Sequence, residues 1–167
     1  MPAKPEPANQ DSARHMLRHA VATIAYRGGK AIRGVPENFS RFEPGNGART
    51  PGKILSHICD LFDWAVSIAH GKEEWHNSKP RSWNEDVARF HAGLAAFDEI
   101  LASDAKLPVP ADKLLQGPIA DALTHIGQIS ILRRLASAPV RAENMVIAEV
   151  VVGRVGPEQA APKFEFD

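Results

Sequence analysis

Residues 120–132 have the sequence ADALTHIGQISIL, which has the spacing of an amphipathic helix. Residues three or four positions apart share a helix face, so Asp121, His125 and Gln128 form one stripe that continues through Leu132. Polar groups on a face that packs against the interior are costly unless they have a partner. We therefore expect Asp121 and His125 to be held by a hydrogen-bonded network or by a divalent metal ion.

The chain before this stretch has three more segments with helical spacing. Thr50 is a good N-cap, and Pro51 follows at the first helical position, where its missing N–H does no harm. Ser82 and Glu85 form a capping-box sequence at the start of the next segment. We predict an all-α fold, a four-helix bundle. Its helices are expected at residues 12–33, 50–71, 82–103 and 114–137, with caps included.

The connections between these segments complete the predicted organisation. Residues 34–49 are rich in Gly, Pro and Asn and are expected to form a crossover connection across one end of the bundle after the first helix, with a rim of a pocket as a further expected role. Gly117 and Pro118 predict a first turn or a kink in the last helix. The apolar, β-branched run at 145–152 predicts a strand or an extended arm. We expect a disordered lead-in at 1–11, the bundle at 12–140 and a C-terminal extended arm packed on it at 141–167.

Composition limits the class of protein. A chain of 167 residues fits one domain, and its 20 basic and 20 acidic residues balance, which argues against a nucleic-acid partner. Cys59 is the only cysteine, so an intramolecular disulfide and a multi-cysteine zinc site are excluded. No stretch approaches the ~20 apolar residues of a membrane span, and the N-terminal residues lack the hydrophobic region of a signal peptide. We expect a cytoplasmic protein with no membrane partner.

His57 is the histidine most clearly placed toward the interior. It shares a helix side with Ile54 and Leu61. Together with Asp121 and His125 it supplies three nitrogen and oxygen ligands from two helices, which is how helix bundles build metal sites. Three protein ligands leave coordination positions open for water or substrate. The other five histidines, expected at the surface, are His15, His19, His70, His76 and His91.

Two stretches of the chain resemble the DinB/YfiT-like superfamily of metalloenzymes. They are RTPGKILSHI at 49–58, followed by Trp64, and HIGQI at 125–129, followed by Leu132 and Arg133. The likeness extends from the first helix through the fourth. Family members are four-helix bundles that hold a divalent metal, often nickel or zinc, through one histidine of the second helix and a HxxxH pair on the last. The resemblance implies that His57 and His125 are metal ligands.

The chain departs from the family pattern at Asp121, where the family has histidine. A carboxylate can still bind a metal there, and it shifts the expected preference toward zinc, manganese or iron. The expected site is thus a divalent ion, nickel or zinc first and manganese or iron as alternatives, held by His57, Asp121 and His125. Gln128 is expected to orient the nucleophile or to hold a ligand in place.

Asn144 and Arg154 flank the apolar run after the bundle. They would border the mouth of the pocket if the arm folds back over it.

The function implied by the resemblance is a metal-dependent hydrolase or transferase acting on a small molecule. Some relatives are S-transferases that use a low-molecular-weight thiol, so such a thiol is an expected partner. Whether the chain is an enzyme stays open at this stage. The alternative is a non-catalytic bundle that binds a small molecule or a protein partner and keeps its Asp/His cluster as a structural hydrogen-bond network. Bundles of this kind often pair through apolar helix faces, which also leaves a homodimer open.

Overall fold

The computed structural model describes residues 7–166, with side chains from Ser12 onward, and confirms the predicted all-α bundle. Residues 1–6 of the expected lead-in lie outside the described residues, but the first helix already begins at Pro7, five positions earlier than predicted. The main helices are α1 (Pro7–Ile32), α2 (Pro51–Ala69), α3 (Trp83–Ala102), the short α4 (Ala111–Leu114) and α5 (Ala120–Leu135).

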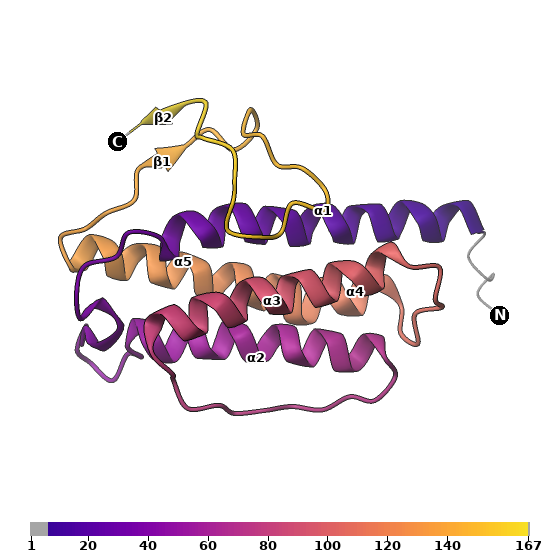
Figure 1. Ribbon diagram of the computed structural model, residues 1–167, viewed down its shortest axis with the longest axis horizontal. Coiled ribbons are helices and arrows are strands. Elements are labelled where there is room, and N and C mark those ends of the chain that lie inside the picture. Colours follow the sequence, from indigo (N-terminus) through magenta and orange to yellow (C-terminus); the bar gives the residue numbers. More distant parts are fainter. Residues whose placement is uncertain (1–6, 167) are drawn as a thin grey trace.

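The four long helices occupy the corners of the bundle (Figure 1). α1 and α2 each pack mainly against α3 and α5, so they lie at opposite corners. The chain between them includes a 3-10 turn, η1 (Phe39–Arg41), and passes across one end of the bundle. α2 and α3 run in the same direction, and residues 70–82 return along the length of the bundle to connect them. The sequence pattern did not predict that this second connection runs the length of the bundle.

The predicted caps set the beginnings of α2 and α3. The Thr50 hydroxyl accepts a hydrogen bond from the Lys53 N–H at 3.4 Å, and Pro51 begins α2. Ser82 and Glu85 form both bonds of the capping box at the start of α3. These short-range contacts explain why the beginnings of both helices could be read from sequence.

The last helix differs from its prediction. It starts at Ala111 and continues through a π-helical turn, η2 (Leu115–Ile119), before α5. Pro118 lies inside this turn and has no N–H to donate, and a Cβ on Gly117 would lie 3.5 Å from the Trp64 ring. A π turn contains more residues than an α turn, so it changes the rotation of the residues that follow. Asp121 is among the first of them.

The core contains the predicted apolar stripes and also buried charges that were not predicted. Arg18 of α1 donates two hydrogen bonds to Asp98 of α3, at 2.9 and 3.0 Å, and Arg89 of α3 pairs with Asp60 of α2. Asp98 and Asp60 are both buried. The buried apolar residues of the predicted stripes include Leu17, Val21, Ile24, Ile54, Ile58, Leu61, Ala65, Phe90, Leu94, Phe97 and Leu101.

The C-terminal arm lies against α1 (Figure 1). Its two short strands, β1 (Ala142–Glu143) and β2 (Glu165–Phe166), pair antiparallel. Lys30 of α1 pairs with Glu143 at 3.0 Å and with Glu165 at 2.7 Å. The run at 145–152, expected as a strand or extended segment, contains turns instead, and Val146 within it is almost fully exposed. In the part of the chain that the structure describes, the sheet consists of β1 and β2, and this run is not part of it.

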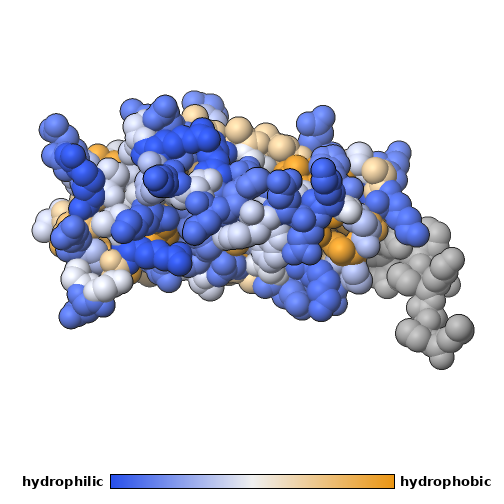
Figure 2. Space-filling view, turned by 90° about the horizontal axis from the view of Figure 1, so that it is seen from below, coloured by the Kyte–Doolittle hydropathy of each residue, from blue (hydrophilic) through white to orange (hydrophobic). Residues whose placement is uncertain are grey.

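The surface seen from below carries the connection between α2 and α3 and is mostly hydrophilic (Figure 2). Its hydrophobic patches are small and separated on the face in view. Within residues 7–166, no helix combines the length and the apolar character that crossing a bilayer requires.

Candidate metal centre

The structure brings the three predicted ligands together where α2 packs against α5. His57 lies in the middle of α2, and Asp121 and His125 lie one turn apart near the start of α5. His57 Nε2 is 3.5 Å from Asp121 Oδ2, and His125 Nε2 is 3.5 Å from Asp121 Oδ1. One donor atom of each residue lies within 4.8 Å of the other two, and no other group of three or more His, Cys, Asp or Glu side chains in the described part of the chain does so.

Gln128 orients the His125 ring. Its Oε1 atom lies 2.9 Å from His125 Nδ1. An amide oxygen only accepts hydrogen bonds, so this placement of the Gln128 amide assigns the proton to His125 Nδ1, which donates to Gln128. The Nε2 lone pair of His125 then faces Asp121 and His57. This is how metal-binding histidines are usually oriented, through a hydrogen bond from the ring nitrogen that does not bind the metal.

The distances between the donor atoms are longer than direct hydrogen bonds and are compatible with a bound ion. Two atoms each ~2.1 Å from a tetrahedral zinc ion are about 3.4 Å apart. The 3.5 Å distances join each histidine to a different Asp121 oxygen, and one donor atom of each of the three residues lies within 4.8 Å of the other two. A direct N–H···O bond would bring the same atoms to about 2.9 Å. Two imidazole nitrogens and a carboxylate also match the ligand types that zinc, nickel, manganese and iron accept.

Asp121 is more exposed than the sequence pattern predicted. Its side chain is 46% exposed, compared with 19% for His57 and 14% for His125. The inward face of α5 consists instead of Ala122, Ile126, Ile129, Leu132 and Arg133. The polar stripe therefore lies along the flank of α5 that faces α2. The cost of burying a carboxylate, on which the sequence argument partly relied, is smaller at this position.

His57 lies in a pocket of aromatic rings. The Trp75 ring, carried by the connection between α2 and α3, is 5.6 Å from the His57 ring and 5.8 Å from the Trp64 ring, both edge to face. Burial lowers the pKa of His57, and the neighbouring His125 and Arg49 lower it further, although Asp121 opposes them. His57 is thus kept neutral, the form in which imidazole can bind a metal.

A pocket of about 500 Å³ adjoins the two imidazoles. His57, His125 and Gln128 form part of its wall. Its size is within the range of small-molecule binding sites. A small molecule in this pocket would lie beside the donor atoms of the candidate centre.

Asn144 and Arg154 do not line this pocket. Both belong to the arm, which lies against α1. The Asn144 side chain accepts a hydrogen bond from the Val146 N–H at 3.1 Å, and Arg154 pairs with Glu149 at 3.5 Å. The prediction that they border the pocket mouth was wrong, because the arm turns back over a different helix.

His91 was expected at the surface but is partly buried against the arm, where its Nδ1 lies 3.2 Å from the Val155 carbonyl oxygen. His15, His19, His70 and His76 are exposed, as predicted.

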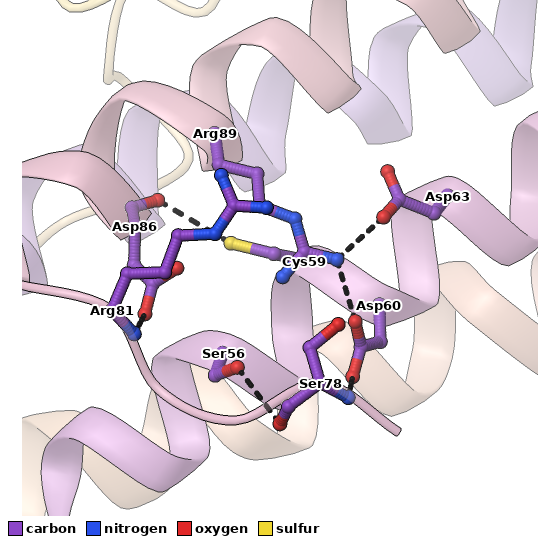
Figure 3. Close-up of polar contacts among 8 residues, drawn as sticks. All are labelled: Ser56, Cys59, Asp60, Asp63, Ser78, Arg81, Asp86 and Arg89. Atoms are coloured by element: carbon purple, nitrogen blue, oxygen red, sulfur yellow. Dashed lines mark hydrogen bonds and ion pairs between the residues drawn. The ribbon is translucent and has the colours of Figure 1, made fainter. Parts of the chain in front are cut away.

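Sequence reasoning missed the residues that hold the α2–α3 connection (Figure 3). The Ser78 N–H donates to Asp60 at 2.9 Å, and Arg89 pairs with the other oxygen of that carboxylate. Burial by itself would raise the pKa of Asp60, but the bonds from Arg89 and Ser78 outweigh it and hold the pKa below its usual value. This contact anchors the connection that carries Trp75 over the site. The sequence feature that could have indicated this contact is Asp60, a carboxylate inside the apolar run of α2.

Comparison of the chain with protein-family models, with curated proteins and with solved structures finds no match.

Proposed function

We propose that this protein is a divalent-metal-binding helical bundle of the DinB/YfiT-like type that acts as a hydrolase or a thiol transferase on a small molecule. His57, Asp121 and His125 would hold the ion, with nickel or zinc as the first candidates and manganese or iron as alternatives. The proposal includes a cytoplasmic setting, which the free thiol of Cys59 supports.

The observation that carries the proposal is the orientation of His125. Its Nδ1–H is committed to Gln128, which leaves Nε2 facing Asp121 and His57. A network built only for stability would more economically use the Nε2–H of one histidine in a short bond to the carboxylate. Neither histidine makes such a bond to Asp121, since both distances are 3.5 Å.

The roles of the chain's own residues follow from this arrangement. When bound, a divalent ion supplies Lewis-acid activation of a water or thiol nucleophile at physiological pH. Gln128 maintains the His125 tautomer, and Trp75 and Trp64 shield the His57 side of the site. The adjoining pocket provides space for a small-molecule substrate and for a low-molecular-weight thiol.

Elemental analysis and zinc or nickel titration of protein prepared without an affinity tag test this proposal. We expect about one ion per chain, and we expect His57→Ala and His125→Ala each to abolish binding while circular dichroism stays helical. His15→Ala and His19→Ala are matched controls, since both side chains are exposed and lie outside the cluster. Protein that contains no metal and takes up none of zinc, nickel, manganese or iron would contradict the proposal and favour the structural-network alternative.

A further inference from the structure

The pocket beside the candidate metal centre has a distinct composition. It lies between residues 47–49, the start of α2 and the C-terminal half of α5. Its lining includes His57 and His125, together with Ile54 and Leu132, which are both almost fully buried and provide an aliphatic wall. Ile131 is 52% exposed and contributes apolar surface to the lining. A pocket with this wall favours a ligand with an apolar body.

Arg49 is the charged residue of this lining. Aspartate and glutamate do not occur among the lining residues, although the Asp121 carboxylate lies 3.5 Å from both lining histidines. Within residues 7–166 the structure shows no hydrogen bond or ion pair that engages the Arg49 guanidinium. Arg49 is exposed and lines the pocket, so its guanidinium is available to a ligand there.

We propose that this pocket binds an organic anion, whose carboxylate or similar group pairs with Arg49 and whose apolar body lies against Ile54, Ile131 and Leu132. Guanidinium pairs with planar oxyanions through two parallel hydrogen bonds, which adds geometric selection to charge. The statement that this anion is the substrate rests on the proposed function. The statement that the pocket binds the anion does not rest on it. A metal ion held with one carboxylate would add net positive charge and favour the same class of ligand.

A second pocket on the other side of Ile131 differs from the first in its lining. That pocket lies between α1, α5 and the arm and includes Lys30 and Glu143 in its lining. Lys30 is already paired with Glu143 and Glu165, and Tyr26 donates to Glu143 at 2.6 Å. Arg27, Arg134 and Arg141 also line this pocket, so it too is cationic, but it does not contain the two histidines of the candidate metal centre.

Calorimetric titration with hexanoate and with its neutral analogue hexanamide tests the inference, on zinc-loaded and on metal-free protein. We expect hexanoate to bind about tenfold or more tightly than hexanamide, as one charged hydrogen-bonded pair would provide. Arg49→Gln should remove this preference in both forms of the protein and leave zinc stoichiometry unchanged. Arg49→Lys, which keeps the charge but not the paired donors, should restore part of the preference.

Lys53→Gln is the matched control, because Lys53 is an exposed cation on the first turn of α2 that does not line the pocket. It should bind hexanoate like the parent protein. Equal affinity for hexanoate and hexanamide, or a preference that survives in Arg49→Gln, would overturn the inference.

The outcomes for zinc and for hexanoate are separable. Zinc binding without Arg49-dependent hexanoate binding rejects the inference and leaves the proposed function standing. Arg49-dependent hexanoate binding to a protein that takes up no metal supports the inference and rejects the proposed function.

Discussion

Asp121 connects the two histidines of the candidate centre, since each of its carboxylate oxygens lies 3.5 Å from a different Nε2. Its side chain is about half exposed, so water can reach it. A carboxylate in this position neutralises part of the charge of a divalent ion without a large desolvation cost. The same residue is the one at which the chain departs from the HxxxH pattern expected of the proposed DinB/YfiT-like type.

We predict that Asp121→Asn weakens metal binding at least about tenfold, because it removes the anionic charge and keeps the shape. Asp121→His, which restores the family pattern, should retain a bound ion and shift preference toward nickel. Competitive titration with a metal-sensitive chelating dye measures both. An Asp121→Asn protein that binds zinc as tightly as the parent would show that the carboxylate is not a ligand.

At the scale of the elements, the parallel pair α2 and α3 depends on charges buried between them (Figure 3). Arg89 reaches across to Asp60 and to Asp63, and its own side chain is mostly buried. Buried charges of this kind are stable only as a pair. Because Asp60 also holds the Ser78 N–H, the same contact positions the connection whose Trp75 ring lies beside His57 of the candidate metal centre.

We predict that Arg89→Met lowers the free energy of unfolding by about 3 kcal/mol, since it leaves the Asp60 carboxylate buried without its counter-charge. Arg89→Lys should cost less because the charge remains. Urea unfolding monitored by circular dichroism provides the measurement. Arg81→Met, an exposed arginine nearby, is the control and should change stability by less than about 0.5 kcal/mol. A similar loss in both methionine variants would contradict the assigned role of the ion pair.

At the scale of the whole molecule, the arm is joined to the bundle at two places. Lys30 and Tyr26 of α1 hold the strand ends through Glu143, and burial and this contact raise the pKa of Tyr26 to about 12. At the second place, His91 of α3 donates from Nδ1 to the Val155 carbonyl. Burial lowers the pKa of His91, although the bond to Val155 opposes the shift.

The lowered pKa of His91 predicts how stability changes with pH. Below about pH 6.5 the unfolded chain binds a proton at this residue more readily than the folded protein, so the free energy of unfolding falls as pH decreases. His91→Gln, which cannot titrate and can still donate to Val155, should show a shallower decline between about pH 7 and pH 5. Urea midpoints across this range test it, with exposed His19→Gln as the control. Equal pH slopes in His91→Gln and the parent protein would refute the prediction.

The sequence by itself was sufficient to predict the local features of this protein. The caps at Thr50 and Ser82, the apolar stripes and the one-turn spacing of Asp121 and His125 depend on interactions within a few residues, which repeat with the period of the helix. The inward position of His57 followed from the same periodicity. These features defined the all-α class and the three residues of the candidate centre.

Only the tertiary structure decided how these pieces meet. The long connections at 33–50 and 70–82 are compatible with several helix arrangements, because closing a longer loop costs little additional entropy. The parallel packing of α2 and α3, the position of Trp75 over His57 and the burial of Asp60 with Arg89 depend on contacts between residues distant in sequence. The exposure of Asp121 also depends on tertiary structure, because the π turn precedes it. The position of Arg49 beside the histidines depends on the connection that crosses the end of the bundle, and no local sequence pattern indicates it.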